Sequence, residues 1–331
     1  MLQSDKLIKA LTTPYSALMS VIFGMMIVSF PIGAYVVFNT DIGREINFEY
    51  PLDGINVFLG GIGFKIPFQF ELGDGFIVAW SAYLILFSIS ICGPNKNFIK
   101  SVSDIMSGGW ENIKNNYLLS MLTWFSILVV FSIIIDSLQQ SVGIPIEPPE
   151  FSNGLIQFFQ ITVSPLTEEI GFRMSLIGLP LFAMFARKAS FTHFLKSLWH
   201  PAKNLEITNY KKAIGLVIIV GIFFGVSHII SGTPWSVGKV AQASFGGVII
   251  GWVYMRYGLA PAILLHWATN YFVFSYVFFV SNINQTSITD GFTNPFLGTV
   301  EILLIIAGIL AATLLVLDYL RTKKESTVTT V

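Results

Sequence analysis

The sequence is short of charge and of cysteine. Charged residues make up 11% of its 331 positions, against roughly a quarter in an ordinary soluble domain. The nineteen basic and nineteen acidic residues cancel, so no net field attracts nucleic acid. The single cysteine, Cys92, excludes an intrachain disulfide and a cysteine-based metal cluster. Apolar residues reach 53%, which excludes a soluble single domain and indicates membrane lipid as a partner.

Long apolar segments predict an all-α, polytopic membrane protein. A spanning helix needs about 20 mainly apolar residues, and we count eight such segments. Pro165 and Pro180 predict a kink or a break in the fourth, which is too long for one simple span. The eight predicted spans are residues 16–39, 76–93, 117–138, 153–186, 213–231, 240–256, 259–281 and 298–320.

Lysine and arginine predict the orientation of these spans. They accumulate on the cytoplasmic side of membrane proteins. With both termini cytoplasmic, most basic residues fall on the inner side, and only Arg44, Lys65 and Lys239 fall on the outer side. We therefore expect an integral, multi-pass membrane protein with both termini in the cytoplasm.

The first outer loop, residues 40–75, contains a period-two apolar pattern. Apolar residues alternate from Ile55 to Leu59 and again from Ile62 onwards, around Gly60-Gly61. This pattern is typical of a β-hairpin, and we expect a small hairpin on the outer membrane surface. An irregular loop is the alternative, because Gly63 and Pro67 weaken a strand.

Two carboxylates and an arginine lie within the fourth span. A charge at the bilayer centre costs at least ~2.5 kcal/mol, so such residues are functional candidates. Glu169 and Arg173 are four residues apart and can pair on one helix face. Glu168 points about 100° away and is left free. A buried ion pair that fixes helix packing would explain Glu169 and Arg173, but an unpaired second carboxylate has no structural benefit.

Two further spans contribute His228 and, on one face, His266 with Asn270. A lone intramembrane histidine is often only an interhelical hydrogen-bonding residue. With Glu168, however, this set suits the activation of water and the stabilisation of an oxyanion. Glu168, His228 and His266 suit a zinc ion with an open coordination site equally well.

The predicted depths of the two histidines disagree. At 1.5 Å per residue, His266 lies roughly 10 Å above the inner end of its span, and His228 roughly 22 Å above Lys212. We expect the fifth helix to begin in a cytoplasmic extension, which would bring the histidines level.

Three motifs carry a family resemblance. Glu168-Glu169-Ile-Gly-Phe-Arg173 fits EExxxR, Phe224 to His228 fits FxxxH, and His266 to Asn270 fits HxxxN, in the expected order. With the glycine-rich lead-in from Gly246 to Pro261, the sequence resembles the CPBP family of intramembrane endopeptidases. That family includes the type 2 CAAX prenyl proteases and the bacteriocin-processing or self-immunity proteins.

The resemblance covers roughly residues 150–280 and implies the domain organisation. We interpret residues 1–331 as a single membrane domain. Within it, residues 1–150 form N-terminal helices with the outer loop, 150–280 form a CPBP-like catalytic core, and 281–331 form the last helix and a cytoplasmic tail.

The resemblance also implies roles for the polar residues. Glu168 would be the general base, His228 would bind and orient the water, and His266 with Asn270 would stabilise the oxyanion. Supporting residues would be Glu169, Arg173 and Phe224. We favour a glutamate mechanism without a cofactor, and a zinc ion held by Glu168, His228 and His266 stays the alternative.

The function predicted in this way is an intramembrane endopeptidase acting on a lipidated or membrane-anchored peptide. Removal of the C-terminal tripeptide from prenylated CAAX proteins is the first candidate reaction. A processing peptidase for other peptides is the nearest alternative. A proton-coupled transporter and an inactive scaffold are alternatives from other classes.

Overall fold

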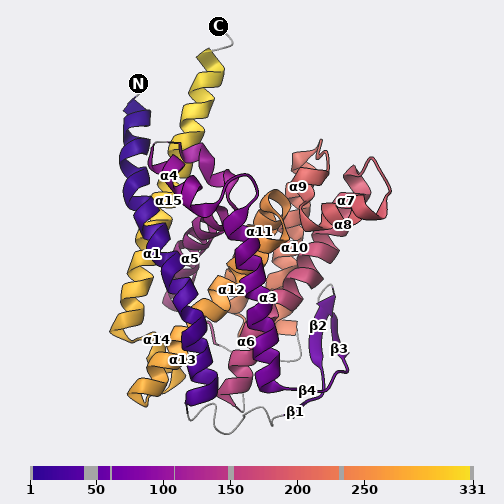
Figure 1. Ribbon diagram of the computed structural model, residues 1–331, viewed down its shortest axis with the longest axis vertical. Coiled ribbons are helices and arrows are strands. Elements are labelled where there is room, and N and C mark those ends of the chain that lie inside the picture. The colour runs from indigo at the N-terminus through magenta and orange to yellow at the C-terminus, as the bar shows by residue number, and fades with distance from the viewer. Residues whose placement is uncertain are drawn as a thin grey trace.

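The structure is a computed structural model, and it describes residues 3–40, 51–59, 62–107, 109–147, 153–230 and 235–328. Helices dominate it (Figure 1), which confirms an all-α polytopic membrane protein. Among these residues, six helical segments are long and apolar enough to cross a membrane, namely Lys6–Asn39, Leu72–Cys92, Tyr117–Ser141, Tyr210–Ile230, Leu259–Asn284 and Pro295–Lys323.

The elements occur in the following order along the chain. The first part contains α1 (Gln3–Asn39), β1 (Pro51–Leu52), β2 (Ile55–Leu59), β3 (Ile62–Ile66), β4 (Phe70–Glu71), α3 (Leu72–Cys92), α4 (Phe98–Met106), η1 (Trp110–Asn115) and α5 (Tyr117–Ser141). The middle contains α6 (Gly154–Glu168), η2 (Glu169–Gly178), α7 (Leu179–Phe185), α8 (Phe191–Trp199), α9 (Pro201–Asn204) and α10 (Tyr210–Ile230). The last part contains α11 (Lys239–Tyr257), α12 (Leu259–Trp267), η3 (Ala268–Phe272), α13 (Val273–Asn284), α14 (Ile288–Phe292) and α15 (Pro295–Val328).

Two predicted spans, 153–186 and 240–256, are not among the six apolar helices. They correspond to α6–η2–α7 and to α11, which pack inside the bundle against α3, α5, α10 and α12. Charged side chains within the first segment and at both ends of the second lower their hydropathy. The ends of α1 and α15 that lead to the termini lie at the same end of the molecule (Figure 1), as an even number of crossings requires. The count of eight spans and the orientation stay predictions.

Strands β2 and β3 pair antiparallel, with Ile55 opposite Ile66 and Leu59 opposite Ile62. The Gly60-Gly61 turn predicted between them lies outside the described residues. Strand β2 packs against α6 and η2, so the pair runs along the side of the bundle (Figure 1) rather than across its end. Its position relative to the membrane surface stays a prediction.

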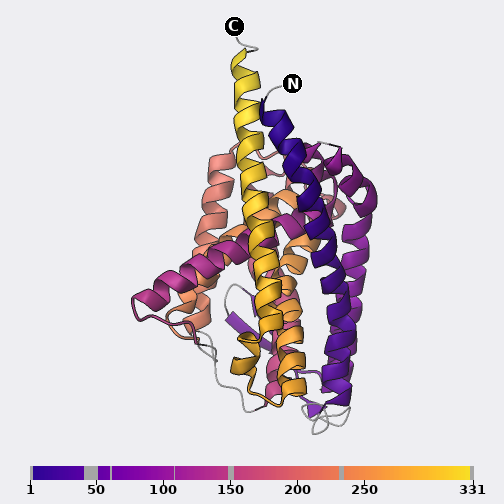
Figure 2. The same cartoon turned by 90° about the vertical axis from the view of Figure 1, so that its left-hand side faces the viewer.

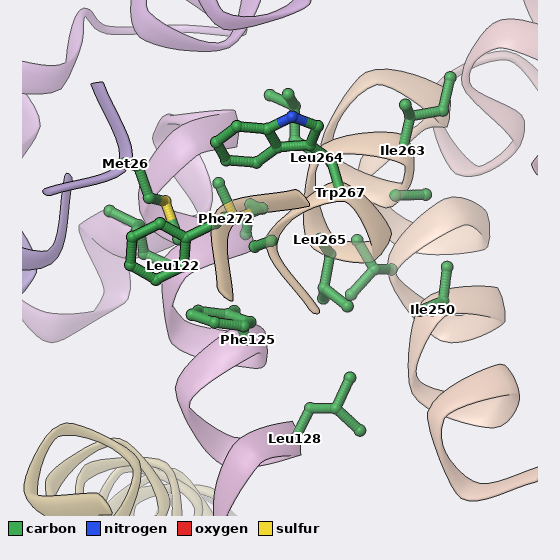
Figure 3. Packing of buried hydrophobic residues seen from close by; sticks show 14 of the residues in the cluster. Met26, Leu122, Phe125, Leu128, Ile250, Ile263, Leu264, Leu265, Trp267 and Phe272 are labelled. Carbon is green, nitrogen blue, oxygen red and sulfur yellow. The ribbon is translucent and has the colours of Figure 1, made fainter. Parts of the chain in front are cut away.

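Helix α12 is the centre of the bundle, and all nine of its residues are buried. Figure 3 shows Leu264 and Trp267 of this helix among Phe125 of α5, Ile250 of α11 and Met26 of α1. A helix that is apolar all round must be enclosed by other elements. The enclosure fixes the rotation of α12, and with it the direction in which its single histidine points.

Glycines allow α10 and α11 to cross closely. A Cβ atom on Gly221 would lie 2.6 Å from the backbone nitrogen of Val248, and one on Gly247 would lie 2.8 Å from the Gly221 carbonyl oxygen. Small residues permit such close approach of helices in membranes. The crossing sets the distance between the histidine of α10 and the rest of the core.

We predict that Gly221→Ala destabilises the protein by about 1–3 kcal/mol, because the new methyl group overlaps the α11 backbone. Gly215→Ala on the same helix is the matched control, since a Cβ there meets no atom within 4 Å. The control should be neutral or stabilising by up to about 1 kcal/mol, because alanine is the better helix former. Thermal unfolding in detergent, followed by tryptophan fluorescence, measures both, and equal shifts would contradict the close crossing.

Candidate active site

Two adjacent glutamates lie where helix geometry changes. Glu168 is the last residue of α6, and Glu169 is the first residue of η2, a π-helical segment. π-Helical turns inside α-helices frequently occur at functional sites. The side chain of Glu169 is 0% exposed and that of Glu168 is 18% exposed. The two carboxylates therefore occupy different environments, as the helix-face argument predicts.

Glu169 contacts two partners, one with each carboxylate oxygen. Its Oε2 lies 3.0 Å from Nε of Arg173, and its Oε1 lies 2.7 Å from Nδ1 of His266. The first contact neutralises the charge of Glu169. The second makes Nδ1 the protonated nitrogen that donates to the carboxylate, because Oε1 can only accept. Nε2 of His266 then faces Glu168, with 3.9 Å between Nε2 and Oε2.

Arg173 is buried, with 1% of its side chain exposed. Its guanidinium lies 4.2 Å from the centroid of the Phe224 ring, and Nη2 donates to the carbonyl of Gly247 at 3.4 Å. A cation over an aromatic face is stabilised by the ring quadrupole. The arginine therefore binds η2 to α10 and α11 as well as neutralising Glu169.

Phe224 brings the two histidines to one level. Its ring packs edge-on against His228, with centroids 4.8 Å apart, and against His266, with centroids 5.8 Å apart. The depths derived from helix rise placed these histidines far apart. The contact with a single ring shows that α10 and α12 are displaced along their axes relative to each other.

His228 keeps one ring nitrogen available. Its Nδ1 lies 2.8 Å from the carbonyl oxygen of Phe224. A carbonyl only accepts, so Nδ1 carries the proton and Nε2 of the neutral ring is an acceptor. The two histidines thus have the same polarity, each with Nδ1–H bound to the protein and Nε2 as the acceptor.

Asn270 projects from η3, the second π-helical segment. Its Nδ2 lies 3.1 Å from Oγ of Ser164 and 3.3 Å from Nε2 of His266. The hydroxyl of Thr269 lies 3.3 Å from Oδ1 of Asn270. Sequence analysis missed Ser164, although it precedes Glu168 by four residues and therefore shares its helix face.

Glu168 has one oxygen without a partner. Its Oε2 is buried and finds no hydrogen-bond partner among the described residues. A buried acceptor left unpaired costs about 1–3 kcal/mol or more when it is charged. Such an atom next to His266 is suited to receive a proton from a water molecule.

The residues predicted as zinc ligands do not form a ligand set in this arrangement. Within the described ranges, no three His, Cys, Asp or Glu side chains are placed to hold a metal ion together. The Nε2 atom that a metal would need on His266 faces the Asn270 amide. Glu168, His228 and His266 therefore do not fit zinc as they stand.

Comparison with known proteins finds one matching family model, and it covers the residues of this site. Residues 151–272 match the family model described as type II CAAX prenyl endopeptidase, Rce1-like. No curated protein and no solved structure matches the chain. The match contains Glu168, Glu169, Arg173, Phe224, His228, His266 and Asn270, and it confirms the resemblance given by the three motifs. Residues 151–272, with all these side chains, are thus similar to the type II CAAX prenyl endopeptidases of the Rce1-like family.

Proposed function

We propose that this protein hydrolyses a peptide bond of a membrane-associated substrate with a water molecule activated by Glu168. The observation that carries this proposal is the buried Oε2 of Glu168, which has no hydrogen-bond partner among the described residues and lies beside Nε2 of His266. The family match supports an intramembrane endopeptidase of the CAAX type.

In the first step, Glu168 and His228 orient the water. Both Oε2 of Glu168 and Nε2 of His228 accept hydrogen bonds, because Nδ1 of His228 donates to Phe224. A water that donates to both turns a lone pair towards the substrate carbonyl. Glu168 takes the proton as the water oxygen attacks the carbonyl carbon.

In the second step, donors stabilise the tetrahedral oxyanion. The Asn270 amide is a donor already held in place by Ser164. Nε2 of His266 also donates where the ring has taken up a second proton from solvent before the substrate binds, and Glu169 at Nδ1 stabilises that cation. Such fixed donors are worth several kcal/mol in a site that excludes bulk water. Glu168 then returns the proton to the leaving amine, and the peptide bond breaks.

The substrate that the family match favours is a prenylated CAAX protein, from which the C-terminal tripeptide is released. Substrate binding is therefore proposed to involve a lipid chain in the membrane and an extended peptide at Glu168.

A second candidate function follows from the position of His228 in the molecule. Helix α10 begins beside α9, towards the end of the molecule with both termini, and runs towards the strand pair β2–β3 (Figure 1). His228 lies two residues before its last residue, Ile230. With both termini cytoplasmic, as predicted, this end of the site faces away from the cytoplasm. That topology favours a processing peptidase for an exported, membrane-anchored peptide without a prenyl group.

We predict that Glu168→Gln lowers kcat by about 10²–10⁴-fold, because the amide cannot accept the proton of water. The purified protein is incubated with a farnesylated CAAX peptide and its unprenylated twin, and mass spectrometry follows release of the tripeptide. Glu301→Gln, at an exposed position of α15, is the matched control and should keep full activity.

The same two peptides also distinguish the two candidate functions. Cleavage of the farnesylated peptide alone supports CAAX processing, and cleavage of both peptides alike supports the second candidate. Unchanged cleavage by Glu168→Gln would refute the general base. Loss of cleavage by Glu301→Gln as well would point to unfolding instead of chemistry.

We predict that metal removal leaves activity unchanged within about twofold, because Glu168 accepts the proton of water without a metal ion in this mechanism. The protein is dialysed against a chelator, and cleavage is measured before and after the addition of zinc. Loss of cleavage that zinc restores would overturn the metal-free mechanism.

A further inference from the structure

A lysine lies beside the His228 end of the site. The backbone N–H of Trp235 donates to the carbonyl of His228 at 3.0 Å. The ammonium of Lys239, the first residue of α11, lies 4.3 Å from the centroid of the Trp235 ring. Nζ of Lys239 also donates to Oε1 of Gln242 at 2.9 Å. One aromatic residue therefore connects the cation to the histidine that we propose as the water-binding residue.

The position of Lys239 is fixed by two neighbouring helices. The next residue, Val240, packs against Gly225 of α10, where a Cβ atom would lie 2.5 Å from the Val240 carbonyl oxygen. The side chain of Gln139, near the end of the obliquely running α5 (Figure 2), donates to the carbonyl of Gly238 at 2.8 Å. The first turn of α11 is therefore held against both α10 and α5.

The charge of Lys239 is not neutralised locally. In the part of the chain that the structure describes, no carboxylate lies within 4.0 Å of its Nζ. A cation in the first turn of a helix is disfavoured by the helix dipole. Lys239 is also partly buried, where an unpaired charge costs more than at the surface. The charge therefore suits a binding partner that carries an anion.

The position of Lys239 relative to the proposed catalytic residues indicates which anion this is. Lys239 is linked to His228 through Trp235, whose backbone N–H donates to the His228 carbonyl, and no ion pair joins Lys239 to Glu168 in the part of the chain that the structure describes. In an extended peptide cut three residues before its end, the terminal carboxylate lies roughly 10 Å beyond the cleaved bond. A cation that lies one aromatic residue away from His228, and that is not paired with Glu168, is placed to meet such a carboxylate.

We propose that Lys239 binds the free C-terminal carboxylate of the substrate and so selects peptides that are cut a few residues before their end. The inference rests on the proposed endopeptidase function and adds a substrate-binding residue to it. Trp235 and Gln242 hold the ammonium in position, and the carboxylate completes its coordination.

The test compares a farnesylated CAAX peptide that ends in a carboxylate with its C-terminal carboxamide twin. We expect wild-type protein to cleave the acid with a kcat/KM about 10- to 100-fold higher, the usual value of a hydrogen bond between charged groups. Lys239→Met should remove this preference by raising KM for the acid, with little effect on the amide. Lys239→Arg keeps the charge and should retain most of the preference.

Lys100→Met on α4, which removes a charge at an exposed position, is the control and should behave as wild type. Equal cleavage of acid and amide by wild type would overturn the inference while leaving the peptidase intact. An equal loss on both peptides in Lys239→Met would also overturn it, and would fit a phospholipid headgroup as the anion. Failure of wild type to cleave either peptide would refute the proposed CAAX reaction and this inference together.

Discussion

The ion pair between Glu169 and Arg173 is the interaction on which the site depends. A guanidinium in the interior of a membrane bundle is expensive unless its charge is compensated. Glu169 supplies the opposite charge at 3.0 Å, and the Phe224 ring covers the guanidinium at 4.2 Å. The second oxygen of Glu169 is then free to hold His266 at 2.7 Å. Breaking a buried pair leaves an uncompensated charge, at a cost of about 3–5 kcal/mol, so the histidine and the arginine are stabilised together.

The backbone around this pair departs from ideal α-helix in both places where polar side chains converge. Glu169 opens the π-helical η2, and Asn270 lies inside the π-helical η3. A π turn places an extra residue in the helix and changes the direction of the side chains that follow. Close glycine contacts at Gly221 and Gly247 then bring α10 towards α11. Irregular turns and small residues thus bring polar groups together from helices that are otherwise apolar.

Local relations were predictable from sequence, and distant ones were not. The pairing of Glu169 with Arg173 follows from a spacing of four residues, and the free state of Glu168 follows from the 100° step. The contact between Glu169 and His266 joins residues 97 positions apart. It depends on the rotation of α12, which its buried neighbours fix and which no spacing reveals. The same reason explains why the contact between Ser164 and Asn270, and the packing of β2 along η2, were not foreseen.

Arg173 and Lys239 differ in their burial and in whether a carboxylate neutralises them. Arg173 is enclosed, with 1% of its side chain exposed, and has Glu169 as a permanent partner. Lys239 is only partly buried and has a neutral amide and an aromatic ring around its ammonium. When Glu168 takes a proton from water, the negative charge moves from the carboxylate to the oxyanion, so the total charge of the site does not change. An enclosed ion pair can keep the histidine in place through this cycle, whereas an anionic peptide end that enters and leaves needs a cation without a permanent partner.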